Sequence, residues 1–376
     1  MSFAHPDFDD HARITFFNDP ETHLRLINAQ HRLVSGRCAG GIRFKSYPCE
    51  IDALTDVLRL SRAMTRKFAL AHLPMGGGKT VVIGDPSRLK SPALLHSLGS
   101  FVHSLGGQYL GGPDVGMGAA DMQVIGNVTP YVGGKAKDTS PPTAIGTFKA
   151  IQALAHFLFG PSGLAGKSVA VQGVGAVGRQ LCVLLKSADA RIVVADVDRA
   201  AAAAVAREVG AEIVPADEIL RSRVDILAPC ALGGVLNSVT IAQLQARAVC
   251  GCANNQLATA EDGLRLHKRG IHFVPDFVVS AGGVIAGALE IGLIDQMGYE
   301  QRLDSIYATT LEVLTQANDR GLSPNEVAES LADRATKAGQ PDSAPGHHNY
   351  LEKSGASRSS ATSPDEHEPP VRAGKM

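Results

Sequence analysis

The sequence predicts an α/β protein of two domains, the second built on a doubly wound parallel sheet. Three observations support this. The chain has 376 residues, too many for one comfortable hydrophobic core. Short apolar runs alternate with helical patterns over residues 167–275, as in parallel sheets whose strands are joined by helices. Residues 1–140 carry longer helical patterns and many glycine-containing loops, which indicates a separate α/β domain with a mixed sheet.

Apolar periodicity predicts the individual elements. In the first domain we expect helices over residues 51–64 and 93–105 and a strand over residues 80–83. The second domain is expected to contain strands at residues 168–171, 191–195, 224–228, 248–252 and 272–274, with helices that include residues 199–209 and 259–268.

The domain boundaries follow from composition. We expect the first domain to cover residues 1–140 and the second residues 141–321, with a helix near residues 322–339 returning to the first domain. The paired prolines Pro141 and Pro142 are expected to end regular structure and to act as a hinge. Ser, Pro, Gly, Glu and Lys dominate residues 340–376, which are expected to form a disordered tail.

Charge and aromatic content exclude several classes of partner. The formal net charge is −1 and basic residues are spread along the chain, so no global field draws it to nucleic acid or anionic lipid. Aromatic residues make up 5% with no Trp, which argues against a platform for stacked bases. The most apolar stretch, residues 277–294, carries Glu290 and is expected to be a soluble helix rather than a membrane span.

The six cysteines show no metal-binding spacing, and no metal site is expected. The pair Cys250 and Cys252 is compatible with a metal or redox site, but a buried strand end is the favoured interpretation. Free thiols, and an N-terminus without the pattern of a signal peptide, lead us to expect a cytoplasmic protein.

A glycine-rich turn follows the strand at residues 168–171 and opens a helix. The first glycine of such a turn permits a tight bend, and the second lets the backbone approach a pyrophosphate. The third lets helix and strand pack closely, while the helix N-terminus offers N–H groups to phosphates. The turn has the spacing G-x-G-x-x-G and consists of Gly173, Val174, Gly175, Ala176, Val177 and Gly178.

An acidic residue completes this dinucleotide-binding pattern. Asp196 lies 18 residues after Gly178, at the end of the next expected strand. A carboxylate there accepts hydrogen bonds from ribose hydroxyls and repels a 2′-phosphate. The expected cofactor is therefore NAD bound in a Rossmann-type domain, although Arg199 nearby leaves NADP open.

Residues 64–80 carry two lysines, Lys67 and Lys79. The run Gly-Gly-Gly-Lys-Thr resembles a phosphate-binding loop, but that motif needs a glycine where Leu73 stands and a strand before the lysine, not after it. We favour glycines that leave room for a substrate against the backbone, with Lys79 facing a cleft. Burial and a second nearby ammonium group both lower the pKa of a lysine toward that of a base.

Several further motifs, in their order and spacing, resemble the glutamate/leucine/phenylalanine/valine dehydrogenase family, and the leucine-type branch in particular. The resemblance covers about residues 29–336. Its motifs begin at Gly40 (GGIR), Met64 (MTRK), Gly76 (GGGK), Gly84 (GDP), Gly112 (GPDVG), Ala228 (APCAL), Ala253 (ANNQ) and Pro275 (PDFVVSAGG).

This resemblance implies roles for individual residues. Lys67 would bind the substrate α-carboxylate, Lys79 would be the catalytic base, and Asp114 would shuttle protons and steer Lys79. The implied reaction is hydride transfer from the substrate Cα, followed by attack of a water activated by Lys79 on the resulting imine, giving a 2-oxo acid and ammonia. The active site would lie in the cleft between the two domains.

The resemblance also implies binding residues. Gly40 and Gly41 would form the floor beneath the substrate. Thr143 would hydrogen-bond the nicotinamide amide, and Asn254 would lie beside the nicotinamide ribose. Since relatives of this kind assemble from several subunits, a homo-oligomer is expected.

The substrate is expected to have an apolar side chain. Glutamate-specific relatives carry a lysine where this chain has Ala39, so a glutamate side chain would lack its partner. Leu303 and Ile306 match apolar pocket positions of the family, and Gly112 adds space. A branched aliphatic amino acid is favoured, and an aromatic one stays open.

Three positions depart from the family pattern. Ser280 stands where the family has asparagine, His72 replaces a usual glycine, and Arg66 replaces an aromatic residue. His72 is compatible with a titrating group near the site, although a loop histidine satisfied by the backbone is favoured. These changes keep open a second class, an NAD-binding sensor with altered catalysis, against which the intact Lys67, Lys79 and Asp114 argue.

Overall fold

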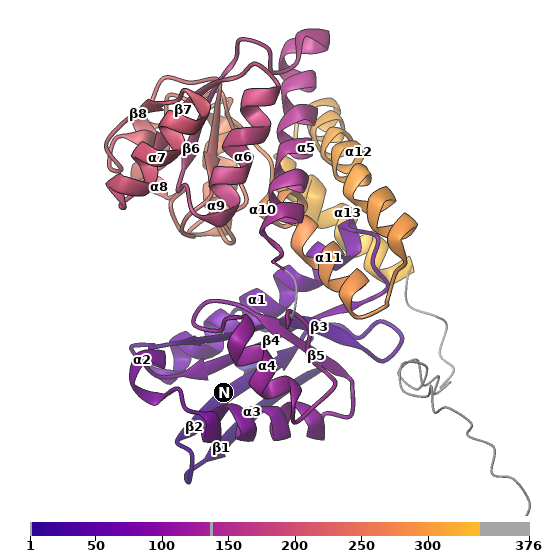
Figure 1. Cartoon of the computed structure of the whole chain (residues 1–376). Coiled ribbons are helices and arrows are strands. Elements are labelled where there is room, and N and C mark those ends of the chain that lie inside the picture. The colour runs from indigo at the N-terminus through magenta and orange to yellow at the C-terminus, as the bar shows by residue number, and fades with distance from the viewer. Residues whose placement is uncertain (1, 136–137, 339–376) are drawn as a thin grey trace, which may run out of the picture. The chain divides into compact units, whose positions relative to one another are not determined.

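A computed structural model describes residues 2–135 and 138–338 of the chain, and these residues form two β-sheets with flanking helices (Figure 1). The tail expected over residues 340–376 lies outside the described residues. Contacts between Cα atoms group residues 1–340 as one compact unit, so the domain boundary at residue 140 stays a prediction.

The first sheet is mixed and has five strands. Strands β1, β2 and β4 are antiparallel neighbours, whereas β3 runs parallel to both β4 and β5. The strand order is β1 (Arg13–Asp19), β2 (Leu24–Gln30), β4 (Gly76–Ile83), β3 (Cys38–Lys45) and β5 (Tyr109–Pro113). The helical segments of this part are η1 (Ser2–Ala4), α1 (Glu50–Leu70), α2 (Pro86–Leu89), α3 (Pro92–Ser104) and α4 (Ala119–Gly126).

Helices cover both faces of this sheet because successive side chains of a strand point to opposite faces. On β4, Val81 belongs to the core cluster that includes Leu58 of α1. Its neighbour Val82 belongs to the cluster that includes Leu98 of α3. Helix α1 is longer than its predicted span of residues 51–64, since its helix continues to Leu70.

The second sheet has six parallel strands. Their spatial order is β11 (His272–Phe273), β10 (Ala248–Val249), β9 (Ile226–Pro229), β6 (Ser168–Gln172), β7 (Arg191–Ala195) and β8 (Glu212–Ile213). The chain runs outward from β6 to β8, then restarts at β9 on the other side of β6, which is the strand order of a Rossmann fold. Ligands of such sheets bind beyond the carboxyl ends of the strands where the order reverses, here β6 and β9.

Helices pack around this sheet and beside it (Figure 1). Helix α13 contacts both α1 and α12, and Arg66 of α1 forms an ion pair of 2.5 Å with Glu329 of α13. The helical segments are α5 (Ser140–Phe159), η2 (Gly160–Ser162), α6 (Ala176–Ser187), α7 (Arg199–Val209), η3 (Ile219–Arg221), α8 (Ser238–Gln243), α9 (Ala260–Lys268), α10 (Asp276–Val279), α11 (Gly282–Glu290), α12 (Gln296–Arg320) and α13 (Pro324–Ala338).

The expectation that Pro141 and Pro142 end regular structure is wrong. Both lie in the first turn of α5, which begins at Ser140. The first N–H groups of a helix have no intrahelical acceptor, so a proline there loses no hydrogen bond, and its fixed φ already suits the helix.

The glycines before Lys79 serve packing between elements, not contact with a substrate. All three lie inside β4, a buried strand. A Cβ at Gly77 would lie 2.1 Å from the backbone nitrogen of Thr65, and one at Gly78 would lie 2.9 Å from the sulfur of Cys38. The glycines therefore let α1 and the neighbouring strands approach β4 closely. In a phosphate-binding loop the lysine stands where the loop leads into a helix. Lys79 lies inside strand β4 instead, so this segment is not a phosphate-binding loop.

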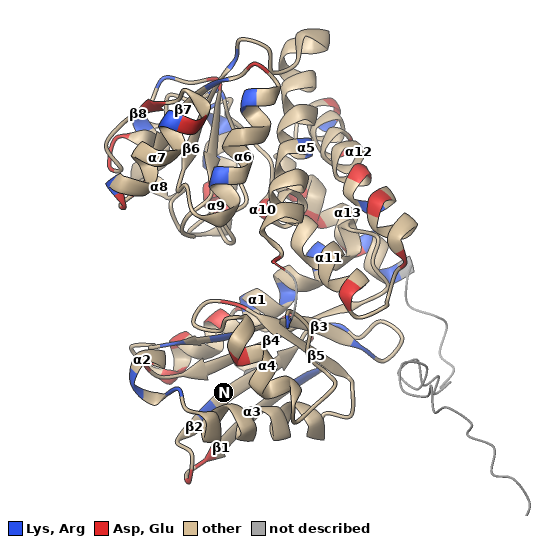
Figure 2. Cartoon of the chain, in the orientation of Figure 1, with Lys and Arg blue, Asp and Glu red and all other residues tan. Residues whose placement is uncertain are grey.

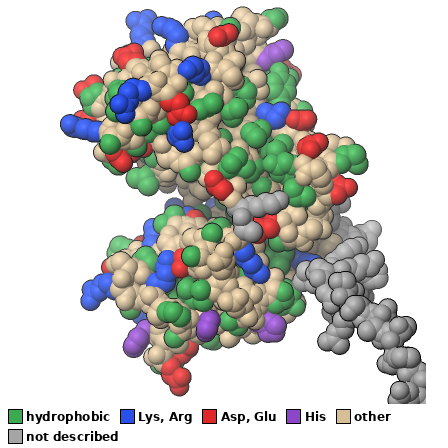
Figure 3. Space-filling view, in the orientation of Figure 1, with side chains coloured by type: hydrophobic (Ala, Val, Ile, Leu, Met, Phe, Trp, Pro, Cys, Tyr) green, Lys and Arg blue, Asp and Glu red, His purple; other side chains and the backbone are tan. Residues whose placement is uncertain are grey.

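Charged side chains of both signs are interspersed over the helices around both sheets (Figure 2). On the face that Figure 3 shows, hydrophobic, basic and acidic side chains are likewise intermixed. Within residues 2–135 and 138–338, no helix combines the length and the apolar character needed to cross a bilayer.

The packing of β4 leads to a stability prediction. Gly77→Ala should destabilise the protein by about 1–3 kcal/mol, because the added methyl group meets the backbone of α1. The midpoint of urea unfolding, followed by circular dichroism, measures this. The matched control is Gly287→Ala in α11, where a Cβ meets no atom within 4 Å. Equal midpoints for the two variants would contradict the packing role of Gly77.

Candidate active site

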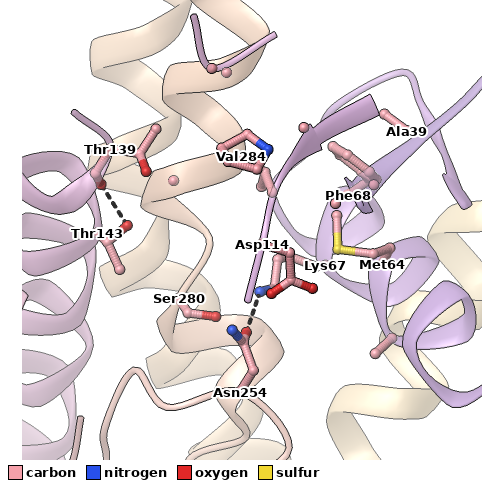
Figure 4. Close-up of a pocket in the computed structure, with 18 of the residues that line it drawn as sticks. Ala39, Met64, Lys67, Phe68, Asp114, Thr139, Thr143, Asn254, Ser280 and Val284 are labelled. Carbon is pink, nitrogen blue, oxygen red and sulfur yellow. Dashed lines mark hydrogen bonds between the residues drawn. The ribbon is translucent and has the colours of Figure 1, made fainter. Parts of the chain in front are cut away.

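A cavity of about 440 Å³ brings together residues from both sheets. Its lining comes from α1, β3, β4 and β5, from the start of α5, from the segments after β9 and β10, and from α10 and α11. Figure 4 shows part of this lining. The sequence-predicted residues that line it are Ala39, Gly40, Gly41, Lys67, Lys79, Gly112, Asp114, Thr143, Val177 and Asn254.

Lys79, Asp114 and Arg43 form a buried charge network in this cavity. Asp114 forms an ion pair with Lys79, and the Nε atom of Arg43 donates to its Oδ2 atom at 3.2 Å. Arg43 also binds Asp56 at 3.0 Å. Burial opposes the ionisation of Asp114, but the positive charges of Lys79 and Arg43 outweigh it and hold the pKa of this carboxyl well below its usual range. The ionised carboxylate of Asp114 therefore holds the side chains of Lys79 and Arg43 in place.

The strand register explains how these three residues meet. Strand β3 lies between β4, which carries Lys79, and β5, which Asp114 follows directly. A Cβ at Gly41 of β3 would lie 2.8 Å from the Nζ atom of Lys79 and 2.8 Å from the Cβ atom of Asp114. Because Gly41 has no side chain, Lys79 can reach Asp114 across β3.

Lys67 occupies a second polar cluster at the same cavity. Its Nζ atom donates to the Oδ1 atom of Asn254 at 3.0 Å, and Figure 4 shows this contact with Asp114 nearby. Burial lowers the pKa of Lys67, and the charge of Lys79 acts in the same direction, whereas Asp276 opposes it. Burial also raises the pKa of Asp276, whose carboxylate accepts from the backbone N–H of Asn255 at 2.9 Å. Lys67 is thus a lysine held near an acidic group with little water around it.

Most of the apolar wall of the cavity comes from α1 and from α11 and the residues after it. Leu303 and Ile306 lie outside the cavity lining. Both are buried on α12, which packs against α5 and α11, and belong to the core there, so their contact with a substrate stays a prediction. The apolar lining residues include Leu60, Ala63, Met64, Phe68, Met75, Leu110, Val284, Ala288, Ile291 and Leu293.

Ala39 and Gly112 leave space beside this wall. Both line the cavity, and a Cβ at Gly112 would meet no atom within 4 Å. The cavity is therefore open at Gly112.

The glycine turn after β6 has the geometry of a dinucleotide-binding turn. Gly173 has a φ of +89°, which favours glycine, and a Cβ at Gly178 would lie 1.9 Å from the carbonyl oxygen of Gly173. A Cβ at Gly175 meets nothing within 4 Å, and this residue caps α6 without a side chain. The first N–H groups of α6, which begins at Ala176, are thus left without a side-chain cap, so the turn fits a pyrophosphate.

Asp196 supports this turn directly. Its Oδ2 atom accepts from the backbone N–H of Val174 at 2.8 Å, and its Oδ1 atom accepts from that of Asp198 at 2.9 Å. The carboxylate is therefore fixed beside the turn at the carboxyl end of β7. Of the turn residues, Val177 reaches the cavity lining.

Two hydroxyl groups of the lining already donate to carbonyls four residues earlier in the chain. Thr143 donates from Oγ1 to the carbonyl of Thr139 at 2.7 Å (Figure 4). Ser280 donates from Oγ to the carbonyl of Asp276, also at 2.7 Å. Their oxygens can still accept a hydrogen bond from a ligand. Ser280 therefore offers a ligand an acceptor, where an asparagine would also offer an N–H donor.

His72 lies outside the cavity lining and is exposed. Its φ is +53°, a conformation that glycine adopts at lower cost, and its carbonyl accepts from Arg302 at 3.1 Å. It is a loop residue, as the favoured interpretation held.

Sequence reasoning gave no role to Arg43 or Asp276, both of which line the cavity. They stand inside the motifs beginning at Gly40 and Pro275, and a charged residue within a Gly-rich or apolar motif is a usable signal for both. Cys252 also lines the cavity, together with Cys230 and without Cys250, the partner that the sequence suggested, because the surroundings of Cys252 depend on the pairing of β9 and β10.

The charge network predicts a pH-dependent stability. The pKa of Asp114 is depressed in the folded state, so its stabilisation is present above the unfolded Asp pKa of about 3.9 and is lost as the pH falls through the folded value. Asp114→Asn should destabilise the protein by about 3–5 kcal/mol at pH 7, because two cations lose their partner. Below about pH 4 the difference in the free energy of unfolding between Asp114→Asn and the unmodified protein should become smaller.

Urea unfolding midpoints across this pH range measure the effect. Asp217→Asn, at an exposed carboxylate, controls for the loss of one negative charge. A constant difference between Asp114→Asn and the unmodified protein at every pH would contradict this assignment.

Known proteins share both the sequence and the fold. Two family models match: the Glu/Leu/Phe/Val dehydrogenase dimerisation domain over residues 11–131 and the glutamate/leucine/phenylalanine/valine dehydrogenase model over residues 195–299. The chain is 38% identical to a leucine dehydrogenase of Geobacillus stearothermophilus, over 92% of this chain and 97% of that protein. It is also 38% identical to a valine dehydrogenase of Streptomyces coelicolor, over 90% and 95%.

Among solved structures, the L-tryptophan dehydrogenase of Nostoc punctiforme matches with a TM-score of 0.76 and 38% identity, over 88% of this chain and 96% of that one. The family models indicate the same family as the relatives that align over nearly the whole chain, and the shared fold agrees with both. The chain belongs to the glutamate/leucine/phenylalanine/valine dehydrogenase family.

Proposed function

We propose that this protein catalyses the reversible NAD-dependent oxidative deamination of an apolar L-amino acid to its 2-oxo acid and ammonia. One observation carries the proposal: Lys67 and the Lys79–Asp114 pair line one apolar cavity that also reaches the glycine turn. The lysines supply an anchor for a carboxylate and a base, and the apolar wall accommodates the side chain.

Lys67 is the proposed carboxylate anchor. Burial lowers its pKa, so this site holds a cation at a cost in free energy. A substrate carboxylate beside Lys67 would favour its charged form and offset that cost. Asn254, which accepts from Lys67 at 3.0 Å, holds the ammonium group in position for this contact.

Lys79 is the proposed base, and Asp114 its positioning partner. Neutral Lys79 can take a proton from the water that attacks the substrate carbon. Asp114 holds Lys79 through the ion pair, while Arg43 holds Asp114. Because the pKa of Asp114 is held well below its usual range, the network favours the steering role for Asp114 over storage of a proton.

The cofactor is proposed to be NAD, which supplies the hydride acceptor when bound. Val174 to Gly178 and the N-terminus of α6 would hold its pyrophosphate, and Asp196 would hold the adenosine ribose. The fixed carboxylate at this position disfavours a 2′-phosphate and supports NAD over NADP. Thr143, which lines the cavity, would accept from the nicotinamide amide.

The proposed substrate is a branched aliphatic amino acid. The wall formed by Met64, Val284, Ala288 and Ile291 suits such a side chain, and Ala39 offers a glutamate side chain no cation. Relatives named leucine and valine dehydrogenases support this choice. One observation favours an aromatic amino acid as a second candidate, namely the open space at Gly112.

We further propose a cytoplasmic homo-oligomer. The family model over residues 11–131 is described as a dimerisation domain, and β1 is an edge strand that exposes Phe16. An edge strand offers unpaired backbone groups to a second copy. The free cysteines are typical of a reducing compartment.

The function is tested with a panel of amino acids at alkaline pH, with NAD and with NADP, by following the absorbance of the reduced cofactor. Leucine, valine or phenylalanine should react far faster than glutamate, and NAD should be preferred. Glutamate as the best substrate would overturn the substrate assignment. Tight NAD binding without turnover of any amino acid would instead favour a sensor.

Lys79→Ala should abolish turnover and leave NAD affinity nearly unchanged, because Lys79 acts on the substrate and not on the dinucleotide. Initial rates and calorimetric titration with NAD measure the two effects. Lys149→Ala is the matched control, since Lys149 pairs with Asp304 far along the chain and lies outside the cavity lining. Substantial turnover by Lys79→Ala would remove Lys79 from the role of base.

A further inference from the structure

Two cysteines lie at the carboxyl ends of adjacent strands. Strands β9 and β10 are parallel, with Ile226 paired to Ala248 and Leu227 to Val249. Beyond the strands the ladder shifts by one residue, and the carbonyl of Pro229 accepts from the backbone N–H of Ala253 at 2.9 Å. Cys230 follows Pro229 and Cys252 precedes Ala253, so both cysteines are sequence neighbours of this hydrogen-bonded pair.

This spacing suits a disulfide. Adjacent strands lie about 4.8 Å apart, and disulfides join Cα atoms about 4.4–6.8 Å apart. The two side chains are also close enough for each thiol to influence the pKa of the other, and both line the same cavity. Cys250, the sequence neighbour that first suggested a pair with Cys252, is fully buried and does not line the cavity.

Cys252 lies closer to a cation than its position in a strand end suggests. Asn254, two residues further along the chain, accepts from the Nζ atom of Lys67 at 3.0 Å. The interaction with Cys230 is the largest influence lowering the pKa of Cys252, and Thr147 and Lys67 act in the same direction, against the effect of burial. Because the thiolate is the reactive form and a nearby cation favours it, we assign the role of nucleophile to Cys252 and that of the resolving thiol to Cys230.

A small oxidant has a path to this pair. Cys230 and Cys252 both line the cavity, beside Asn254 and close enough to Lys67 for its charge to act on Cys252. Cys38, Cys182 and Cys250 are fully buried, and the cavity lining contains none of them.

We propose that Cys252 and Cys230 form a peroxide-responsive modification site within the active-site cavity, which closes reversibly into a disulfide. The Cys252 thiolate attacks one oxygen of hydrogen peroxide, the O–O bond breaks, and the leaving hydroxide takes a proton to become water. Sulfur is oxidised to sulfenic acid and the peroxide is reduced. Cys230 then attacks the Cys252 sulfur, the S–O bond breaks, and the hydroxide leaves with the Cys230 proton as a second water.

The disulfide changes the site in two ways. It consumes the Cys252 thiol near Lys67, and it ties the segments after β9 and β10, of which the latter carries Asn254. Activity should therefore fall on oxidation and return on reduction. This consequence rests on the proposed dehydrogenase function, whereas formation of the disulfide does not.

Peptide mapping tests the disulfide without reference to activity. The full-length protein is treated with hydrogen peroxide, alkylated and digested with trypsin. Cleavage after arginine gives one peptide of residues 224–247, whose cysteine is Cys230, and one of residues 248–265, which holds Cys250 and Cys252. The two peptides should be found cross-linked, with Cys250 alkylated, and dithiothreitol should separate them. Absence of the cross-link, or a cross-link through Cys250, would overturn the proposal.

Three variants sharpen the test. Cys252→Ser should abolish the cross-link, Cys250→Ser should retain it, and Cys49→Ser, at an exposed site on the N-terminal side of α1, should behave as the unmodified protein. Each variant is compared with its own untreated activity. A loss of activity that dithiothreitol restores in the unmodified protein but not in Cys252→Ser is expected. Equal reversible loss in both would overturn the proposed consequence. An inactive untreated protein would count against the proposed function and leave the mapping decisive for the disulfide.

Discussion

The active site depends on one buried interaction, the carboxylate of Asp114 held between Lys79 and Arg43. Each charge alone would be costly in this environment, and together they form a stable arrangement that leaves an amine facing the cavity. The network reaches across β4, β3 and the end of β5, so its geometry is fixed by backbone pairing rather than by a flexible loop. A site of this kind keeps its base in one position whatever the substrate side chain.

Close backbone approach is the constraint that makes this network possible. Gly41 leaves the space through which Lys79 reaches Asp114, and Gly40 lies so near β4 that a Cβ there would meet the carbonyl of Gly78 at 1.7 Å. The glycines of β4 allow α1 to pack on the same strand, and α1 carries Lys67 near its end. The packing of α1 on β4 and the contact between Lys79 and Asp114 therefore both require glycine at these positions.

Reversal of the strand order between β6 and β9 governs the other half of the site. It brings the glycine turn after β6 beside the segment after β9, where a Cβ at Gly173 would meet Ala231 at 2.6 Å. The adjacent pairing of β9 and β10 sets Asn254 near Lys67 and places Cys230 and Cys252 at neighbouring strand ends. One edge of one sheet thus carries the proposed dinucleotide contacts, the hydrogen-bond partner of Lys67 and the thiol pair.

The sequence by itself determined the local features: the strands at residues 168–172 and 191–195, the helix over residues 199–209, the glycine turn and the family to which the chain belongs. These depend on periodicity and on short motifs, which neighbouring residues encode. Tertiary structure decided the rest. Leu303 and Ile306, which the sequence suggested for the substrate pocket, lie in the core, because the packing of α12 against α5 and α11 sets which face of α12 is buried. The role of Arg43 and the partner of Cys252 depend on strand pairing between distant segments, and no local pattern specifies that pairing.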